Sequence, residues 1–515
     1  MNGNLYERLC AETNAARPFA RQAGSGLLDY AGLRARSAQY ANALLDLGVS
    51  RGDRVLVQAD KSGEMILLYL GALRAGAVFV PLNTAYTIAE LEYYIGDAQP
   101  RIVVCAPGKL ATILPVARKL GVSHVLTLGG TEAGGTLAAR ADLADTRCPS
   151  VECEPDDIAA IIYTSGTTGR AKGAMLTHGN LAANAFGLKA CWHFTTDDVL
   201  LHALPLFHIH GLFVAVNVTL AAGASLILLP AFDTDAIVAN LSAATVYMGV
   251  PTHYVRLLQD RRVNRELASP MRLFISGSAP LMAETHREWL ERTGHSLLER
   301  YGMSETGIIA SNPYNGERVP GTVGFPLPGV SVRVVDVDTG VPLAVGLVGM
   351  IEITGPNVFA GYWRMPDRTQ SEFRSDGYFI SGDLGHFDER GYLHIVGRSK
   401  DLVISGGFNV YPREVEAEID AIAGVVESAV FGLPHPDFGE GVTAAVVTRA
   451  PLAADAIIAQ LKERLAGYKC PKRVLFVSEL PRNTMGKVQK GALRGQYANL
   501  YQRATGALAS GVQQR

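Results

Sequence analysis

The sequence predicts an α/β protein: a large N-terminal region of doubly wound β-sheets with a β subdomain, followed by a small α+β C-terminal domain. Residues 1 to about 150 alternate helical and strand-like hydrophobic patterns, which is typical of β-α-β units and a mostly parallel sheet. Residues 321–395 have shorter strand patterns with frequent Gly and Pro. Beyond Asp401 a further unit has its own helix and strand patterns and is long enough to fold alone.

In the first region, glycines end two of the expected helices. The expected elements are helix Leu33–Leu47 before Gly48, strand Arg54–Gln58, helix Glu64–Ala75 before Gly76, strand Val78–Pro81, helix Ile88–Gly96 and strand Arg101–Cys105. Residues Thr131–Pro155 are small, polar and acidic. We expect them to form a surface connection.

The middle of the chain continues the alternation. The expected elements are helix Asn180–Trp192, strand Val199–Ala203, strand Arg272–Ser276, helix Glu284–Thr293 and strand Leu297–Arg300. The three strands lead into polar, glycine-bearing loops at 205–211, 277–280 and 301–307. Because ligands of such sheets bind where strands end, this convergence predicts a site.

One uncharged run, Gly211–Phe232, is long enough to cross a bilayer. Asn217 and the Ala-Ala-Gly-Ala break at 221–224 divide it, and no cationic flanks mark an insertion boundary. We expect a buried helix, a turn and a strand ended by Pro230.

The chain has 515 residues, of which 48% are apolar, and a formal net charge of −2. Neither half carries a basic block, which argues against nucleic acid or a membrane surface as the main partner and favours a small ligand. The N-terminus lacks the apolar core of a signal peptide. The cysteines have no metal-ligand spacing; they are Cys10, Cys105, Cys148, Cys153, Cys191 and Cys470. Together with the N-terminus, this pattern predicts a cytoplasmic protein.

The stretch Tyr163–Gly173 predicts a phosphate-binding loop. An apolar strand pattern, Ile158–Tyr163, leads into hydroxyls, glycines and two cations, and glycines let backbone N–H groups approach an anion closely. The spacing differs from a Walker A loop, because Gly166 and Gly169 are too close together. The predicted phosphate ligands are Thr164, Ser165, Gly166, Thr167, Thr168, Gly169 and Lys172, with Arg170 adding charge.

The C-terminal unit begins with a strand pattern and a Gly-Gly pair, and Pro412 suits the first turn of a helix with Val415, Ile419 and Ile422 on one face. The other expected elements are strands Leu402–Ser405, Val425–Phe431, Val442–Thr448 and Arg473–Val477, and helix Ala453–Leu465.

Five stretches resemble, in order and spacing, the core motifs of the adenylate-forming acyl-CoA synthetases, and the resemblance covers nearly the whole chain. They are Tyr163–Gly173, Tyr301–Gly307, Tyr378–Asp383, Gly397–Glu416 and Pro481–Lys490. Within that group, the stretches Phe207–Leu212, Ser276–Pro280 with His286–Trp289, and Gly406–Val410 look most like malonyl-CoA synthetases. One departure is Ala171, where the family usually has Pro before the lysine.

The resemblance implies a reaction in two halves. A carboxylate attacks the α-phosphorus of ATP and expels pyrophosphate, and the thiol of coenzyme A then displaces AMP. It also implies a large ATP- and acid-binding domain, 1–399, and a small mobile lid, 400–515, that carries the catalytic lysine and lines the coenzyme A path.

The resemblance assigns roles to single residues, several of which would read alone as ordinary surface or packing residues. Lys487, a lysine in a polar loop, becomes the catalytic cation, with His208, Glu305 and Thr306 as further catalytic candidates. Glu305 would bind Mg²⁺, an ion that prefers one or two carboxylates plus phosphate oxygens, and Thr306 would bind the α-phosphate. The nucleotide and coenzyme A residues would be Gly277, Ser278, Ala279, Tyr301, Gly302, Met303, Asp383, Arg398, Lys400, Gly406 and Gly407.

Within this set, Tyr301 would stack on adenine, Asp383 would accept both ribose hydroxyls with Arg398 in support, and Lys400 would be the hinge. Gly406 and Gly407 would leave space for the pantetheine arm.

The acid-binding residues would be Arg287, His208, His210, Ser278, Thr252 and Met303. Arg287 would hold a second carboxylate, so the pocket favours malonate. Methylmalonate and other short acids stay open, because residues 307–310 are apolar. The alternatives are a monocarboxylate CoA ligase, an adenylation protein that charges a carrier domain, and a nucleotide-binding regulatory protein without catalysis.

Overall fold

The computed structural model describes residues 2–10, 13–22, 26–129, 134–164, 171–483 and 486–501. The chain forms two compact units: unit 1 comprises 1–333, 352–380 and 391–393, and unit 2 comprises 334–351, 381–390 and 394–515. Asp383, Arg398 and Lys400 therefore lie in the same unit as Lys487. The predicted division into 1–399 and 400–515 stays a prediction.

Unit 1 contains a seven-stranded sheet in the order β18-β8-β7-β4-β3-β5-β6. Its strands are β3 (Arg54–Gln58), β4 (Val78–Pro81), β5 (Ile102–Cys105), β6 (His124–Thr127), β7 (Ile158–Thr164), β8 (Lys172–Thr177) and β18 (Gly361–Tyr362). Strands β3 to β7 pair in parallel, whereas β8 is antiparallel to both β7 and β18. The predicted α/β class is confirmed.

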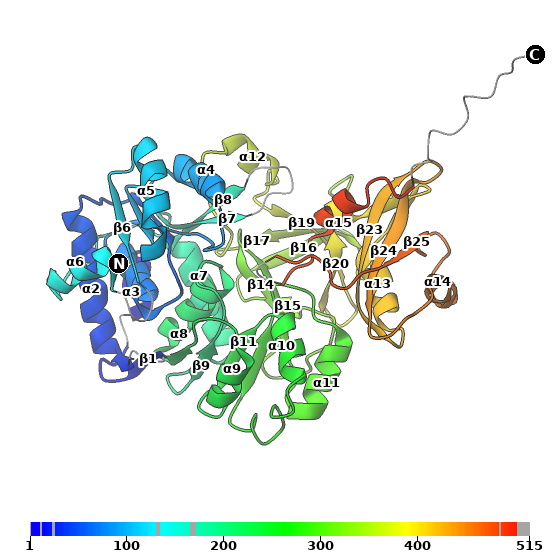
Figure 1. Ribbon diagram of the computed structural model, residues 1–515, viewed down its shortest axis with the longest axis horizontal. Coiled ribbons are helices and arrows are strands. Elements are labelled where there is room, and N and C mark those ends of the chain that lie inside the picture. Colours follow the sequence, from blue (N-terminus) through cyan, green and yellow to red (C-terminus); the bar gives the residue numbers. More distant parts are fainter. Residues whose placement is uncertain are drawn as a thin grey trace, which may run out of the picture. The chain divides into compact units, whose positions relative to one another are not determined.

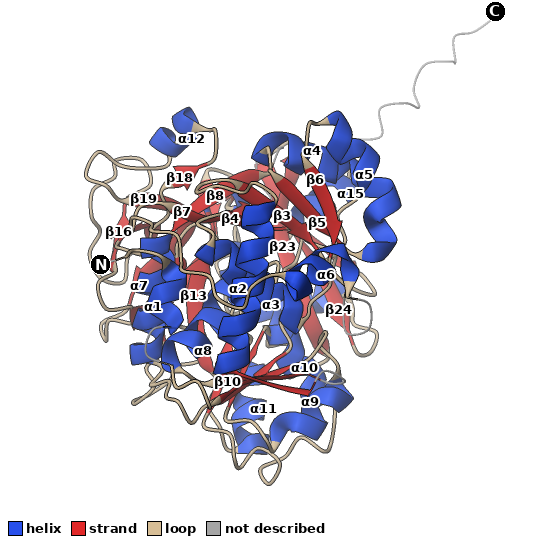
Figure 2. Cartoon of the chain, turned by 90° about the vertical axis from the view of Figure 1, so that its left-hand side faces the viewer, coloured by secondary structure: helices blue, strands red, loops and turns tan. Residues whose placement is uncertain are grey.

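Helices alternate with these strands along the chain, as the pattern predicts. They are α2 (Tyr30–Asp46), α3 (Gly63–Arg74), α4 (Ile88–Ala98), η1 (Pro107–Lys109), α5 (Leu110–Lys119) and α6 (Gly135–Leu143). Figure 2 shows α2 and α3 side by side in front of the strands, and a Cβ at Gly71 of α3 would lie 2.5 Å from Cβ of Tyr40 in α2. The two helices therefore need glycine at their contact.

A nine-stranded sheet has the order β15-β14-β13-β12-β11-β9-β10-β1-β2. Its strands are β1 (Pro18–Gln22), β2 (Gly26–Asp29), β9 (Val199–His202), β10 (Ser225–Leu228), β11 (Val246–Gly249), β12 (Leu273–Ser276), β13 (Leu298–Met303), β14 (Gly307–Ser311) and β15 (Phe325–Pro326). The associated helices are α1 (Leu5–Cys10), α7 (His178–Cys191), η2 (His210–Val216), α8 (Asn217–Ala222), α9 (Thr234–Leu241), α10 (Pro251–Leu258) and α11 (Ala283–Thr293), several of which are labelled in Figure 1.

Side-chain caps place several helix starts earlier than hydrophobic periodicity does. Asp29 accepts a hydrogen bond from the Gly32 N–H and begins α2 at Tyr30 rather than at Leu33. Thr177 forms a capping box with Asn180 and begins α7 at His178. Polar caps fix the helix start, and periodicity shows only where the apolar face begins.

The apolar run Gly211–Phe232 forms buried π-helical and α-helical turns followed by β10, as predicted. Among the described residues, no helix combines the length and apolar character needed to cross a membrane. The expected surface connection Thr131–Pro155 is wrong in part, because α6 lies within it and buries Leu137 and Ala141. Its Ala-rich sequence offers no polar N-cap, so the helix start gave no local signal.

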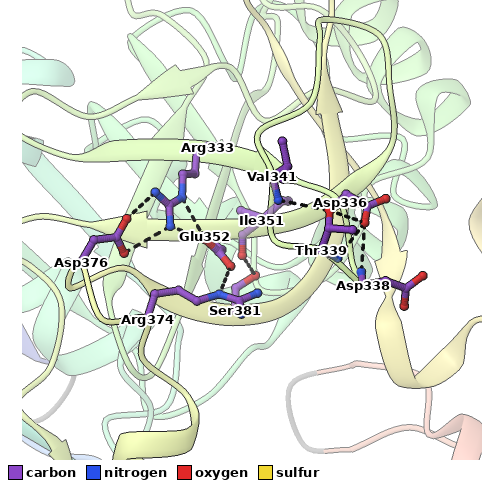
Figure 3. A network of polar contacts seen from close by, with 10 residues as sticks. All are labelled: Arg333, Asp336, Asp338, Thr339, Val341, Ile351, Glu352, Arg374, Asp376 and Ser381. Atoms are coloured by element: carbon purple, nitrogen blue, oxygen red, sulfur yellow. Dashed lines mark hydrogen bonds and ion pairs between the residues drawn. The ribbon is translucent and has the colours of Figure 1, made fainter.

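A four-stranded sheet has the order β16-β17-β19-β20, and the chain passes from one unit to the other within these strands. Its strands are β16 (Ser331–Val335), β17 (Gly349–Thr354), β19 (Phe379–Phe387) and β20 (Leu393–Arg398). The fully buried Glu352 carboxylate lies 2.8 Å from the Arg333 guanidinium and 2.6 Å from that of Arg374, and Asp376 pairs with Arg333 as well (Figure 3). This buried carboxylate is compensated on both sides.

Unit 2 contains the predicted α+β module. Its sheet joins β21 (Val403–Ser405), β22 (Phe408–Val410), β23 (Val425–His435), β24 (Gly439–Thr448) and β25 (Arg473–Phe476). The helices are η3 (Ser399–Asp401), α13 (Pro412–Asp420), α14 (Ala454–Lys462) and α15 (Lys490–Gln496). Pro412 is the first residue of α13, and Val415 and Ile419 are buried in the module's core, as the sequence predicts.

Candidate active site

Four neighbouring strands of the nine-stranded sheet run parallel: β9, β11, β12 and β13. Their carboxyl ends therefore meet at one edge, where ligands of open α/β sheets bind. From the ends of β9, β11 and β12 the chain leads into the loop with His208 and His210, into Thr252 at the start of α10 and into Gly277–Ala279, and Tyr301–Met303 are the last residues of β13. Most of the residues predicted from separate motifs thus follow strands that end together.

The centre of this edge is formed by Arg300, Ser278 and His210, which we call the Arg300 cluster. The Ser278 hydroxyl lies 3.2 Å from His210 Nδ1 and 3.3 Å from Arg300 Nη2. A Cβ at Gly277 would lie 2.4 Å from the guanidinium carbon of Arg300, so this glycine makes room for it. Ser278 has φ +71°, a left-handed conformation that non-glycine residues seldom adopt and that is enriched at functional sites.

The Arg300 cluster has no compensating carboxylate in the part of the chain that the structure describes. Arg300 is only 5% exposed, and among the described residues no Asp or Glu forms an ion pair with it. Burial lowers the pKa of its guanidinium to about 9. Arg300 Nε and His210 Nε2 are buried without a hydrogen-bond partner in the described part of the chain. A buried cation with open donors is costly unless an anion completes it.

The histidines around this cluster are held neutral. Burial lowers the pKa of His208 to about 4 and that of His202 to about 3, and it places that of His210 well below its usual range. The half-buried Lys61 donates to the His202 carbonyl at 2.9 Å, and desolvation lowers its pKa as well. At neutral pH the imidazoles therefore offer hydrogen bonds rather than charge.

The remaining predicted acid-binding residues are distributed unevenly. Thr252, Met303 and His208 are half-buried at the strand ends. Arg287 is exposed on α11, and its Nε bonds the Ala283 carbonyl of the same helix at 3.4 Å. The role of Arg287 stays a prediction, and the structure offers Arg300 as a buried alternative.

A second group of charges involves Lys172, Glu372, Tyr362 and Glu305, which we call the Glu372 network. Lys172 Nζ lies 2.9 Å from Glu372 Oε1 and 4.1 Å from the centre of the Tyr362 ring. The Tyr362 hydroxyl lies 2.6 Å from Glu372 Oε2 and 3.1 Å from Glu305 Oε1. Burial and the two carboxylates raise the pKa of Tyr362, which keeps its proton.

The turn that follows β13 is fixed from two sides. The Asn357 amide donates to the Thr306 carbonyl at 2.8 Å, and Asn184 both donates to the Ile308 carbonyl and accepts from the Ile308 N–H. Thr306 is fully buried, and Glu305 is 6% exposed. These contacts hold the acid predicted to bind Mg²⁺ on a rigid hairpin.

Some of the predicted residues lie outside the described part of the chain, and others lie within strands. Ser165, Gly166, Thr167, Thr168, Gly169 and Arg170 lie outside the described residues, whereas Thr164 ends β7 and Lys172 begins β8. Tyr301 is half-buried in β13. At Gly302 a Cβ would lie 2.2 Å from the Gly307 carbonyl oxygen, so packing of the hairpin alone requires glycine there.

In unit 2, Asp383 and Arg398 form a close ion pair. Arg398 Nε lies 2.6 Å from Asp383 Oδ1, and Asp383 is 3% exposed. The Asp383 N–H donates to the Ser381 hydroxyl at 3.0 Å, and that hydroxyl donates to the Ile351 carbonyl. A carboxylate fixed in this way suits the two hydroxyls of a ribose.

Lys487 lies in a small hairpin of unit 2. The Asn483 side chain accepts from the Lys487 N–H at 2.9 Å, and the Asn483 N–H donates to the Lys487 carbonyl. The side chain is exposed, and no described carboxylate forms an ion pair with it, whereas nearby Lys490 pairs with Glu416 at 2.6 Å.

Lys400 is exposed in η3, and desolvation lowers its pKa while the neighbouring Asp401 carboxylate acts in the opposite direction. Gly406 and Gly407 have φ +61° and +82° in the turn between β21 and β22. Both conformations favour glycine, so the tight turn is itself a reason for the pair.

Arg300, Tyr362 and Glu372 were not among the residues predicted from the sequence. Arg300 had a signal, because a cation at the end of an apolar strand, directly before a site loop, is unusual in a buried sheet. Tyr362 and Glu372 had no such signal in the sequence, because they approach Lys172 and Glu305 only when β18 pairs with β8.

Comparison with known proteins identifies a family. Residues 8–363 match the model of the AMP-binding enzyme family, and residues 414–487 match the model of the AMP-binding enzyme C-terminal domain.

Individual relatives span nearly the whole chain. The crystal structure of ATP-bound MatB from Rhodopseudomonas palustris is 56% identical, with a TM-score of 0.96 over 98% of this chain and 100% of that chain. A feruloyl-CoA synthase from Amycolatopsis sp is 36% identical, over 92% of this chain and 95% of the relative. A malonate–CoA ligase from Arabidopsis thaliana is 35% identical, over 88% of this chain and 79% of the relative.

Proposed function

Because this chain belongs to the AMP-binding enzyme family, we propose that it is an AMP-forming acid–thiol ligase that joins malonate to coenzyme A at the expense of ATP. The reaction proceeds through a malonyl adenylate. The family match and the full-length similarity to CoA ligases support the reaction class. The malonate–CoA ligase of Arabidopsis thaliana supports the acid.

The observation that carries the choice of malonate is the Arg300 cluster. Arg300 is buried beside Ser278 and His210, and no described carboxylate compensates it. One carboxylate of a dicarboxylate attacks the α-phosphorus of ATP, and the second carboxylate can pair with Arg300. An aromatic or fatty acid offers no such anion and would leave the guanidinium buried without a counter-ion.

In the first half-reaction an oxygen of the malonate carboxylate attacks the α-phosphorus, and the bond to the bridging oxygen of pyrophosphate breaks. Such chemistry needs positioning and charge neutralisation more than covalent help. Lys172 would hold the pyrophosphate half, Thr306 the α-phosphate, and Asp383 the ribose with Arg398 in support. Lys487, which has no carboxylate partner among the described residues, would neutralise charge on the attacking carboxylate and the α-phosphate.

In the second half-reaction the sulfur of coenzyme A attacks the acyl carbon, the bond from that carbon to the phosphate oxygen breaks, and AMP leaves with the electron pair. The thiol proton passes to solvent or a nearby base. We assign the turn at Gly406 and Gly407 to the pantetheine arm, with Lys400 as the hinge between the half-reactions.

Glu305 fits the role of a Mg²⁺ ligand. No group of three or more His, Cys, Asp or Glu among the described residues is arranged to hold a metal by itself. A single carboxylate on a rigid turn is the donor set expected when phosphate oxygens supply other ligands. Bound there, Mg²⁺ would neutralise phosphate charge.

A panel of acids tests the proposal through AMP released in the presence of ATP, Mg²⁺ and coenzyme A. The panel contains malonate, methylmalonate, acetate, octanoate and ferulate. We expect malonate to give the highest kcat/KM, methylmalonate to follow, and the three monocarboxylates to be at least about 100-fold poorer, because they leave the Arg300 charge unpaired. Preference for ferulate or octanoate would contradict the assignment.

We propose the cytoplasm as the compartment. All six cysteines are free thiols, and five of them are buried. A reducing environment suits such a set.

A further inference from the structure

We propose that Glu372 is a positioning residue for nucleotide binding. Its carboxylate holds the Lys172 ammonium and the Tyr362 hydroxyl, so that the cation for the phosphates and the carboxylate of Glu305 are ordered before ATP binds. The inference rests on the proposed function, which assigns Lys172 to the phosphates and Glu305 to Mg²⁺.

Glu372 uses both of its oxygens. Oε1 lies 2.9 Å from Lys172 Nζ and 2.6 Å from Arg368 Nη2, and Oε2 accepts from the Tyr362 hydroxyl at 2.6 Å. The side chains of Lys172 and Glu372 are 12% and 16% exposed, so solvent screens their pair only in part. Three different parts of the chain therefore meet at one carboxylate.

Backbone pairing brings these parts together. Tyr362 of β18 lies opposite Ala174 of β8, and the Trp363 N–H donates to the Gly173 carbonyl at 2.7 Å. This register places the Tyr362 ring beside Lys172. Residue 372 immediately follows the short helix α12 (Pro366–Ser371) as its C-cap.

Tyr362 connects the lysine to the acid. Its hydroxyl lies 3.1 Å from Glu305 Oε1, and the Phe359 N–H donates to the Glu305 carbonyl at 2.8 Å. One hydroxyl proton serves one acceptor at a time. Glu372 is the nearer acceptor and holds the Tyr362 side chain in place, and from this position the same hydroxyl can donate to Glu305 in exchange.

The Lys172 ammonium has three N–H donors, and Glu372 accepts one of them. In the described part of the chain the other two have no acceptor and can meet phosphate oxygens, while the flexible lysine chain has already lost much of its rotamer freedom. Ordering a side chain before binding removes that entropic cost from the association step. Glu372 should therefore strengthen ATP binding. If it merely occupied Lys172 in place of phosphate, its removal would tighten binding instead.

The substitution Glu372→Gln tests the sign. We expect the Kd of ATP with Mg²⁺, measured by isothermal titration calorimetry, to rise about tenfold, and the KM for ATP to rise in parallel. The KM for malonate and the rate of malonyl-CoA formation from synthetic malonyl adenylate should change less than twofold. Unchanged or tighter ATP binding would overturn the proposal.

Two further variants separate the contacts. Tyr362→Phe keeps the ring beside Lys172 and removes the hydroxyl, so we expect the Mg²⁺ concentration for half-maximal ATP binding to rise severalfold while binding without Mg²⁺ changes less than twofold. The control is Arg368→Gln, which removes a 41% exposed cation from the same carboxylate. It should change ATP binding less than twofold, and a tenfold loss there would overturn the specific role of the Lys172 contact.

The proposed function and this inference can fail separately. Wild-type protein that does not bind ATP would refute both. Wild-type protein that binds ATP but releases no AMP with malonate would refute the choice of acid, and ATP binding by Glu372→Gln would still decide the role of Glu372. Glu372→Asp keeps the charge on a shorter side chain and should bind ATP more tightly than Glu372→Gln does. Its affinity therefore shows whether Glu372→Gln lost only the charge or also the fold.

Discussion

The Arg300 cluster and the Glu372 network, both in unit 1, treat buried charge in opposite ways. Arg300 is 5% exposed and forms no ion pair with a described carboxylate, and its guanidinium donates to the Ser278 hydroxyl. Lys172 is 12% exposed on its side chain and pairs with Glu372, which Arg368 and Tyr362 also contact. The first group contains a buried cation that no described carboxylate pairs with, whereas in the second group one carboxylate contacts two cations and a hydroxyl.

This difference predicts two roles: the Arg300 cluster selects the acid, and the Glu372 network positions side chains for ATP. An uncompensated buried cation destabilises the free protein and binds the anion that completes it, so it discriminates between acids by the charge they carry. A compensated network contributes little selectivity, but it fixes side chains that any nucleotide triphosphate must meet. The comparison therefore predicts that changes in the Arg300 cluster alter which acid is used and that changes in the Glu372 network alter how tightly ATP binds.

The largest effect is expected for Arg300→Met. Losing the guanidinium should lower kcat/KM for malonate by about 10³, because a charge-assisted, buried contact disappears, while the KM for ATP should change little. The same substitution should raise the melting temperature of the free protein, since a buried uncompensated charge is replaced by an apolar side chain of similar length. Both are measured on one preparation, by AMP release and by thermal unfolding.

Glu352 provides the matched control for that prediction. It is a buried charge that two arginines compensate at 2.8 and 2.6 Å. Glu352→Met should lower the melting temperature, because it removes the carboxylate that pairs with Arg374 and leaves Arg333 with Asp376 alone. If Arg300→Met were also destabilising, the contrast between open and closed charges would be lost.

Lys487→Ala should give the next largest effect and extends the comparison to unit 2, where Lys487 also lacks a carboxylate partner among the described residues. We expect adenylation to fall by roughly 10² to 10³, as for loss of a donor that stabilises developing charge. Exchange of labelled pyrophosphate into ATP in the presence of malonate measures this step. Formation of malonyl-CoA from supplied malonyl adenylate should continue, and Lys490→Ala is the control. Unchanged exchange in Lys487→Ala would remove the assignment.

The histidines beside the Arg300 cluster predict a dependence of stability on pH. Burial lowers the pKa of His202 to about 3, whereas an unfolded histidine titrates near 6.5. Below a pH of about 6.5, His202 binds a proton in the unfolded chain but not in the folded protein, so the free energy of unfolding falls as the pH drops. By pH 5 this residue alone should remove about 2 kcal/mol from the free energy of unfolding.

Urea denaturation at pH 8 and pH 5 tests this, with His202→Gln as the variant. The glutamine amide can still donate to the Gly211 carbonyl, which His202 Nε2 contacts at 2.8 Å, but it does not titrate. The variant should lose less stability between the two pH values than the wild type. His124→Gln, on β6, is the control and should keep the wild-type slope. Equal slopes in all three proteins would contradict the prediction.

Periodicity and motif spacing predicted the two kinds of sheet, the buried run 211–232 and the strand-end loops, because these depend on local hydrophobic pattern. Strand pairing between distant segments was not available from the sequence, so the Glu372 network was missed: Tyr362 meets Lys172 only through the register of β18 on β8. The surroundings of Arg300 were missed for a related reason. The motif indicated Tyr301 and its loop, and only the fold shows that the neighbouring Arg300 lies beside Ser278 with no described carboxylate paired to it.

The smallest effect is expected for Arg287→Ala, which compares the cation that the sequence suggested with the one the fold buries. Arg287 is exposed, and its Nε bonds the Ala283 carbonyl of its own helix. A solvated arginine contributes little binding energy, since water and salt screen its charge. We therefore expect less than a twofold change in kcat/KM for malonate, against about 10³ for Arg300→Met. A large loss in Arg287→Ala with a small one in Arg300→Met would reverse the comparison, because the acid would then be selected at an exposed cation and the buried one would be structural.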